Sequence, residues 1–249
     1  MYDALVAGAW GLLAGSALLA GAALGTFFAV PRRLIALIMA FGSGVLIAAV
    51  SYDLIAEAHE TGGLLPTALG TAAGAAVYSA GNALLARRGG RHRKRSGGHQ
   101  PSEEQQPGSG SAIAMGAVLD GVPESVVIGA SLLGGGSVGL ATIGAVFISN
   151  VPEGMASAAG MRTAGRGRGY VFGLWGGIAL LSGAAALLGN ALLGDAPPQA
   201  LAAVTAFAAG AILAMIADTM LPEAQEDAHL ATGLVMVAGF LTALGLGEL

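Results

Sequence analysis

Two short segments of the chain carry the same carboxylate pattern. Asp120-Gly-Val-Pro-Glu124-Ser is followed, 29 residues later, by Ser149-Asn-Val-Pro-Glu153-Gly. In each segment two oxygen-bearing side chains stand four residues apart, so on a helix they project from one face. Carboxylate, amide and hydroxyl oxygens gathered in this way can hold a divalent cation. The pattern predicts a metal site, with these candidate ligands: Asp120, Glu124, Ser149, Asn150 and Glu153.

A proline stands directly before the glutamate in both segments. Pro123 and Pro152 remove the hydrogen bonds that the carbonyls of Leu119 and Ile148 would accept in an unbroken helix. Such carbonyls are additional oxygen ligands, tolerated in a membrane where they line a cavity or find another partner. The alternatives are a flexible kink and a protonated glutamate bonded within the bundle. Four acids and amides at matched spacing favour the metal site.

The elements that position these residues are membrane helices. The 249 residues are 55% hydrophobic and only 10% charged, whereas soluble domains carry roughly a quarter charged residues. We expect one all-α domain over residues 1–249, retained in the membrane from its first apolar run. Apolar runs of roughly 20 residues, the length that crosses a bilayer, predict eight spans near 4–30, 34–56, 64–86, 111–133, 139–161, 170–193, 199–221 and 228–247.

Basic residues predict the orientation of these spans. All 11 lie in the first, third and fifth connections, on one side of an eight-span protein. Because basic loops stay in the cytoplasm, we expect a multi-pass protein of the cell membrane with both termini extracytoplasmic. The third connection, residues 87–110, is predicted to be a flexible basic loop that anchors the topology and contacts anionic lipid. His92 and His99 are a weak signal for metal sensing, and no aromatic platform suggests nucleic-acid binding.

A second internal match relates the second and seventh spans. Residues 41–60 match residues 207–226, with Phe41 and Gly44 recurring as Phe207 and Gly210. The two spans cross in opposite directions, as in the inverted repeats of transporters, although chance similarity in Ala/Gly-rich sequence is the alternative. Both carry acids that could concentrate cations along a pathway, or that are simply solvated helix ends. These pathway candidates are Asp53 and Glu57 near the outer end, and Asp218 and Glu223 near the inner end.

The segments SNVPEGMASAAGMR and DGVPESVVIGA resemble the fifth and fourth helices of the ZIP (Zrt/Irt-like) metal-ion transporters. This resemblance extends over the whole chain and implies eight helices in a 3+2+3 bundle with inverted repeats. It places Glu124, Asn150 and Glu153 on metal-ligand positions. It also implies that a divalent metal, zinc or another such as Mn, Fe or Cd, moves as substrate toward the cytoplasm, with no catalytic cofactor. A homodimer is compatible with the sequence.

The chain departs from the family pattern at several positions. Asp120 stands where the family has His, Gly121 where it has Asn, and Ser149 where it has His or Gln. The sixth span, around Leu181-Ser182-Gly183, has no acid where many bacterial relatives have a Glu of a second metal site. We therefore expect one bound metal and a harder or broader range of cations than zinc alone.

Other chemistries have less support in the sequence. The absence of cysteine excludes thiolate ligands and cysteine nucleophiles, and no P-loop is present. The alternative from another class is an intramembrane hydrolase in which Asp120 and Glu124 act as acid and base. That alternative lacks a Gly-x-Gly-Asp protease signature, a Ser/His pair in the spans and a His-Glu-x-x-His helix. We expect a transporter and not an enzyme.

Overall fold

The computed structural model describes residues 2–133 and 140–247, and every regular element in these ranges is helical. Labels beginning with η mark short stretches of wider, π-helical winding. The elements are α1 (Tyr2–Phe27), α2 (Arg32–Ala48), η1 (Ala49–Ile55), α3 (Ala56–Gly62), α4 (Leu64–Leu85), η2 (Ala86–Gly90), α5 (Ser109–Ala130), α6 (Leu140–Thr163), α7 (Arg168–Leu193), α8 (Pro198–Met215), η4 (Ile216–Met220), α9 (Leu221–Ala228) and α10 (Ala231–Gly247).

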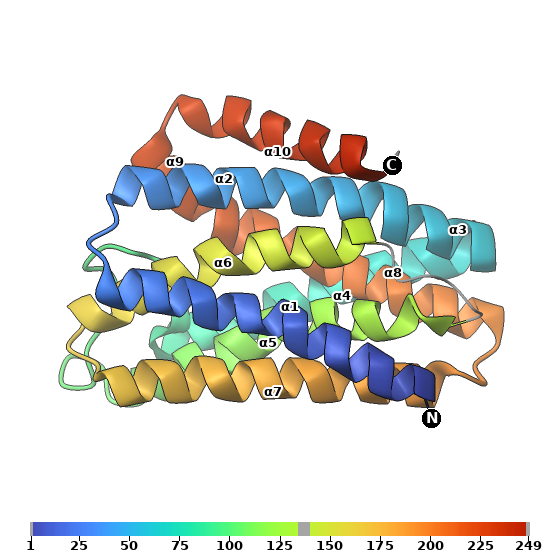
Figure 1. The fold of residues 1–249 in the computed structure, drawn as a ribbon, viewed down its shortest axis with the longest axis horizontal. Coiled ribbons are helices and arrows are strands. Elements are labelled where there is room, and N and C mark those ends of the chain that lie inside the picture. Colours follow the sequence, from blue (N-terminus) through green and yellow to red (C-terminus); the bar gives the residue numbers. More distant parts are fainter. Residues whose placement is uncertain (1, 134–139, 248–249) are drawn as a thin grey trace.

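The helices lie along one long axis and alternate in direction, so that the start of α1 and the end of α10 are at the same end (Figure 1). Each predicted span has a helical counterpart. The second and seventh are longer than predicted, because η1 and α3 continue α2 to Gly62 and η4 and α9 continue α8 to Ala228. Gly63, with φ +80°, then lets the chain turn directly into α4. The connection expected between the fourth and fifth spans, residues 134–138, lies outside the described residues.

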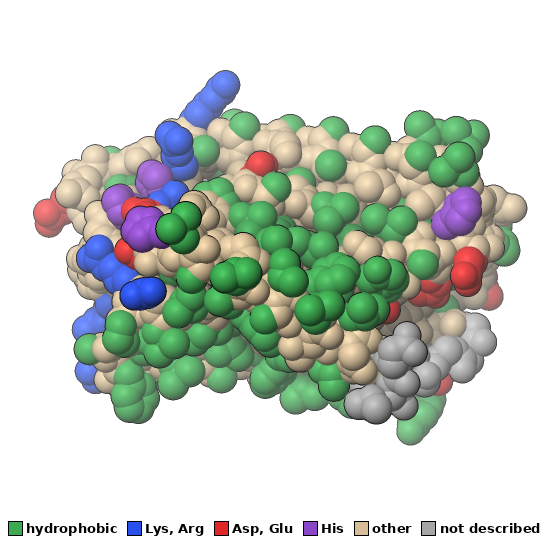
Figure 2. All heavy atoms as spheres, turned by 90° about the horizontal axis from the view of Figure 1, so that it is seen from above, with side chains coloured by type: hydrophobic (Ala, Val, Ile, Leu, Met, Phe, Trp, Pro, Cys, Tyr) green, Lys and Arg blue, Asp and Glu red, His purple; other side chains and the backbone are tan. Residues whose placement is uncertain are grey.

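The surface of the bundle is that of a membrane protein. Among the described residues, five helices are long and apolar enough to cross a bilayer: Tyr2–Phe27, Arg32–Gly62, Ser109–Ala130, Arg168–Leu193 and Pro198–Ala228. Large hydrophobic side chains such as Leu12, Leu69 and Leu188 are exposed on the outside of the bundle. Figure 2 shows hydrophobic side chains along the middle of the molecule, with Lys and Arg gathered at one end. This is the end opposite to the two termini.

The helices related by the longer internal match make matching contacts. On α2, a Cβ at Gly44 would collide with the carbonyl oxygen of Met236, and one at Gly239 on α10 with that of Phe41. On the other pair, a Cβ at Gly210 of α8 would collide with the carbonyl of Thr71, and one at Gly74 of α4 with that of Phe207. Small residues allow this close approach of membrane helices. The α2–α10 pair thus corresponds to the α8–α4 pair, including a match between α10 and α4 that the sequence comparison missed.

Close backbone contacts divide the bundle into two groups of four passages. In one group, α1 packs on α6 and α7, and α5 packs on α7. In the other, α2 packs on α10, and α4 packs on α8. Within the described helices, every glycine whose added Cβ would lie under 3.0 Å from another helix's backbone makes that contact inside its own group. Across the groups, the Cα of Ser149 would be 3.2 Å from a Cβ at Gly42. The groups therefore meet at a less tightly packed interface.

Candidate functional site

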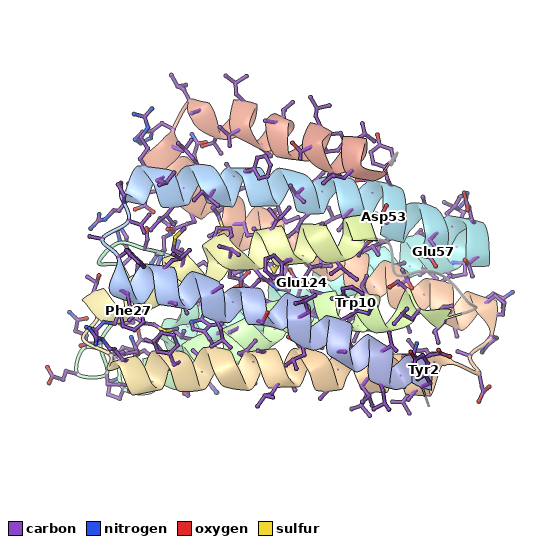
Figure 3. All side chains as sticks on the ribbon, in the orientation of Figure 1. Tyr2, Trp10, Phe27, Asp53, Glu57 and Glu124 are labelled. Atoms are coloured by element: carbon purple, nitrogen blue, oxygen red, sulfur yellow. The ribbon has the colours of Figure 1, made fainter. Side chains whose placement is uncertain are left out.

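The predicted acids lie inside the bundle on α5 and α6. Asp120, Glu124 and Glu153 have exposed fractions of 2%, 3% and 4%. Figure 3 shows Glu124 about midway along the bundle, between its two ends. Pro123 and Pro152 both lie within continuous helices, so the carboxylates project from regular helical positions beside them. Charged groups at this depth cost at least ~2.5 kcal/mol each on insertion scales, which marks the region as a candidate functional site.

Asp120 accepts hydrogen bonds from two other elements. The hydroxyl of Tyr78, on α4, donates to its Oδ1 at 2.5 Å. Arg93, from the loop before α5, donates from Nε to Oδ2 and from one terminal nitrogen to Oδ1, both at 2.9 Å. The same guanidinium donates to the Oδ1 of Asn82 at 2.7 Å and to the Tyr78 hydroxyl at 2.8 Å. Asp120 is therefore held in a bidentate ion pair within a polar network.

The second cation in the site is Lys94. Its Nζ lies 2.8 Å from Oε2 of Glu153 and 3.5 Å from Oδ2 of Asp120, so it bridges α6 and α5. Glu124 differs from both of these acids, because its buried Oε1 has no hydrogen-bond partner among the described residues. An unpartnered buried oxygen costs roughly 1–3 kcal/mol. Glu124 is thus the acid of the group with coordinating capacity left unused.

Two predicted ligands point elsewhere in this arrangement. The amide nitrogen of Asn150 donates to the carbonyl of Ala14 on α1 at 3.1 Å, and the Ser149 hydroxyl donates to the carbonyl of Val146 at 2.9 Å. In the described part of the chain, no group of three or more His, Asp or Glu side chains is arranged to hold a metal ion. The structure brings Asp120 and Glu153 to one ammonium group and leaves Asn150 and Ser149 bonded to backbone.

Part of the loop before α5, which the sequence analysis expected to be a flexible anchor, is buried among the helices. Arg93 and Lys94 are only 2% and 3% exposed, and Gln100 is 3% exposed. The Gln100 amide donates to the carbonyls of Arg93 and Arg95 within the loop and to that of Ser157 on α6. Unpaired acids in the bundle attract basic side chains from the adjacent loop, and this physical cause is invisible in a local stretch of sequence. Residues 93–100 are therefore part of the candidate site.

The inner pathway candidates also meet this loop. Glu223, buried near the start of α9, accepts hydrogen bonds at its Oε1 from the backbone N–H of Ser96 at 2.9 Å and from its hydroxyl at 3.2 Å. Arg95 forms ion pairs with both Glu223 and Glu226, and His99 lies 2.7 Å from Glu226. Glu223, one of the predicted pathway acids, is therefore paired with the loop.

The two loop histidines lie side by side near this ion-pair network. The ring centroids of His92 and His99 are 5.7 Å apart. Partial burial, together with the charges of Arg95 and Arg91, lowers the pKa of His92, which favours its neutral form. The other ring of the pair, His99, faces the carboxylate of Glu226.

Two of the remaining pathway candidates, Asp53 and Asp218, lie on π-helical stretches, and Glu57 lies on the α-helix that follows η1. Asp53, on η1, is half-buried and accepts a hydrogen bond from Thr142 of α6 at 2.7 Å, while Glu57 on α3 is exposed. Figure 3 places both toward the end of the molecule that holds the termini. Asp218, on η4, is exposed and accepts a hydrogen bond from Ser79 at 3.2 Å. Single π-helical turns are frequent at functional sites, and here η1 and η4 each carry one of the predicted acids.

Four site residues were missed by the sequence analysis: Tyr78, Asn82, Arg93 and Lys94. Tyr78 and Asn82 carried a usable signal, since two polar side chains four residues apart in an apolar span share one helix face. Arg93 and Lys94 carried none, because they stand in a run of basic residues of similar type. No protein-family model matches the chain, and no curated protein matches it significantly.

Proposed function

We propose that the chain is a membrane transporter that carries a divalent metal cation toward the cytoplasm through the carboxylates of α5 and α6. The observation that carries this proposal is the buried set of Asp120, Glu124 and Glu153 inside a bundle with an apolar surface. Figure 3 shows Glu124 about midway along that bundle. In such an environment acids hold cations because little else offsets the cost of their burial. In the structure, the side chains of Arg93 and Lys94 supply the positive charges beside Asp120 and Glu153. The site therefore binds positively charged groups.

The proposed architecture is the 3+2+3 bundle with inverted repeats, in which α5 and α6 are the central pair. The corresponding glycine contacts of α2–α10 and α8–α4 support this symmetry. Alternating access then follows from movement of the group α1, α5, α6 and α7 against the group α2, α4, α8 and α10. Tight glycine contacts within each group and looser contacts between them favour this division. The acids would travel with the first group.

The proposed substrate follows from the ligand chemistry. Three carboxylates without a neighbouring nitrogen or sulfur ligand suit cations that accept oxygen, such as Mn²⁺, Fe²⁺, Cd²⁺ and Zn²⁺. We place the protein in the cell membrane with both termini outside, because the end rich in Lys and Arg belongs in the cytoplasm. Basic residues in the first, third and fifth connections support this orientation.

Uptake into proteoliposomes tests the proposal. Purified protein is reconstituted, and entry of Zn²⁺, Mn²⁺, Fe²⁺, Co²⁺ and Cd²⁺ is measured for the natural chain and for Glu124→Gln. We expect saturable uptake of more than one of these metals, and a loss of about 100-fold or more in the variant, because its single amide oxygen replaces a charged ligand. Glu124→Gln is preferred over Glu153→Ala because it leaves no cation unpaired.

The matched control is Glu104→Gln, which makes the same substitution at an exposed loop position. Uptake by this control should equal that of the natural chain. Undiminished uptake in a folded Glu124→Gln protein would overturn the site assignment. Metal binding without flux would indicate a receptor, and absence of both would leave the intramembrane hydrolase as the surviving alternative.

A further inference from the structure

We propose that Arg93 and Lys94 are tethered competitors of the transported cation, so that a divalent ion must displace residues 93–96 before it can bind. This inference rests on the proposed transport function and concerns the regulation of the same site. The two side chains bind the carboxylates that the metal would use. Arg93 takes both oxygens of Asp120, and Lys94 binds Glu153 while lying 3.5 Å from Asp120.

The charges of the loop match those of the proposed substrate. Arg93 and Lys94 together bring two positive charges to Asp120 and Glu153, and a divalent cation brings two as well. An exchange of one for the other leaves the local charge balance unchanged. Removal of the loop cations alone, or of the carboxylates alone, would leave buried charges without compensation, which is costly. The loop therefore stabilises the empty site and competes with the ion that fills it.

The helices around the loop are shaped to receive it. A Cβ at Gly116 of α5 would overlap the side chain of Arg93. A Cβ at Gly160 of α6 would overlap the carbonyl oxygen of Arg95 and the side chain of Gln100. At both positions the three nearest atoms belong to the loop. These two glycines form a cradle that a single methyl group would fill.

The loop is also attached to α9. Ser96 donates twice to Glu223, and Arg95 pairs with Glu223 and Glu226 on α9. These contacts join the loop to the group that contains α9, whereas Arg93 and Lys94 bind acids on α5 and α6 of the other group. The loop thus bridges the two groups across their interface. Relative movement of the groups requires that one of its two attachments open.

The test measures Zn²⁺ and Mn²⁺ binding and flux for a charge variant and a steric variant. Arg93→Gln/Lys94→Gln removes both tethered charges, and Gly160→Ala keeps every charge but expels the loop backbone. We expect each to lower the apparent Kd for the transported metal by about tenfold or more, because a tethered group competes at an effective concentration in the millimolar range. The steric variant keeps the test decisive if the charge variant does not fold.

The matched control is Arg88→Gln/Arg91→Gln, which removes two charges from exposed positions near the same loop. Its metal affinity should equal that of the natural chain. A cysteine at Ser96 reports the loop position, because the chain has no other cysteine. Maleimide labelling of Ser96→Cys should be several-fold faster when Gly160→Ala is added.

The possible results separate this inference from the proposed function. Unchanged or weaker metal binding in both folded variants, with normal uptake by the natural chain, would overturn the competitor role and leave the transporter standing. A tenfold gain in the control would also overturn it, because the effect would then be general electrostatics. If the natural chain neither binds nor transports a metal, the proposed function fails first and this inference fails with it.

Discussion

The two approaches to the buried acids differ in how their charges are compensated. At the basic end, Glu223 is met by Ser96 and Arg95, and the acids beyond it by Arg93 and Lys94. At the end with the termini, Asp53 accepts one hydrogen bond from Thr142, and Glu57 is exposed. At the basic end, the acids are paired with the cations of a loop. At the other end, Asp53 is bonded only to the neutral hydroxyl of Thr142 among the described residues.

This difference indicates that the two ends control different steps. A neutral hydrogen bond contributes about 1 kcal/mol and breaks readily, whereas parting a buried ion pair costs several kcal/mol. We therefore expect the outer acids to influence how fast a cation arrives. The inner contacts should decide whether the site is free to bind it. Substitutions at the basic end should therefore change mainly the stability, and substitutions at the end with the termini should change mainly the transport.

The largest effect is expected at Asp120. Asp120→Asn leaves the buried guanidinium of Arg93 without its carboxylate, and should lower the free energy of unfolding by about 3–5 kcal/mol. Adding Arg93→Gln removes the orphaned charge and should restore most of that loss. Thermal unfolding in detergent measures both variants. Equal instability in the single and double variants would show that this pair does not hold the inner approach closed.

An intermediate effect is expected at Asp53. Asp53→Asn removes a negative charge from the outer approach and should raise the KM for metal uptake about two- to tenfold, with the effect shrinking at high salt. Thr142→Val breaks the same hydrogen bond but keeps the charge, so it should leave the KM unchanged and cost about 1 kcal/mol of stability. If the two variants change the KM equally, the role of Asp53 is structural and not electrostatic.

The smallest effect is expected at Glu103, at the far end of the basic loop. Hydrogen bonds from the backbone N–H groups of Gly108 and Gly110 lower the pKa of Glu103 from its ordinary value of 4.5. A lowered pKa in the folded state contributes stability above the ordinary value and loses it as the pH falls through the lowered one. Amide exchange at Gly110 should be faster in Glu103→Gln than in the natural chain at pH 6. The two should converge in acid.

The features that depend on local composition could be predicted from the sequence. The all-helical fold and the membrane class are confirmed. They could be predicted because each span of about 20 apolar residues can be recognised from its own sequence. Asp120, Glu124 and Glu153 were found as an anomaly of charge in apolar surroundings, and all three are buried. The extension of the second passage to Gly62 was missed, since its last turns are polar.

The features that depend on partners distant in sequence could not be predicted. Nothing in the run from Arg87 to Arg95 distinguishes the two side chains that enter the bundle from those that stay exposed. The choice depends on which of them reach Asp120 and Glu153, and on the space that Gly116 and Gly160 leave. Asn150 is a similar case, because its preference for the carbonyl of Ala14 depends on where α1 lies.

The corresponding glycine contacts of α2–α10 and α8–α4 also bear on how the chain arose. Gly44 and Gly239 lock one parallel pair, and Gly210 and Gly74 lock another that runs the opposite way. Duplication of one ancestral unit that could insert into the membrane in either orientation leaves such a pattern. In a chain of that origin both halves would share the glycine contacts, whereas the basic residues, confined to one end, would set a single orientation.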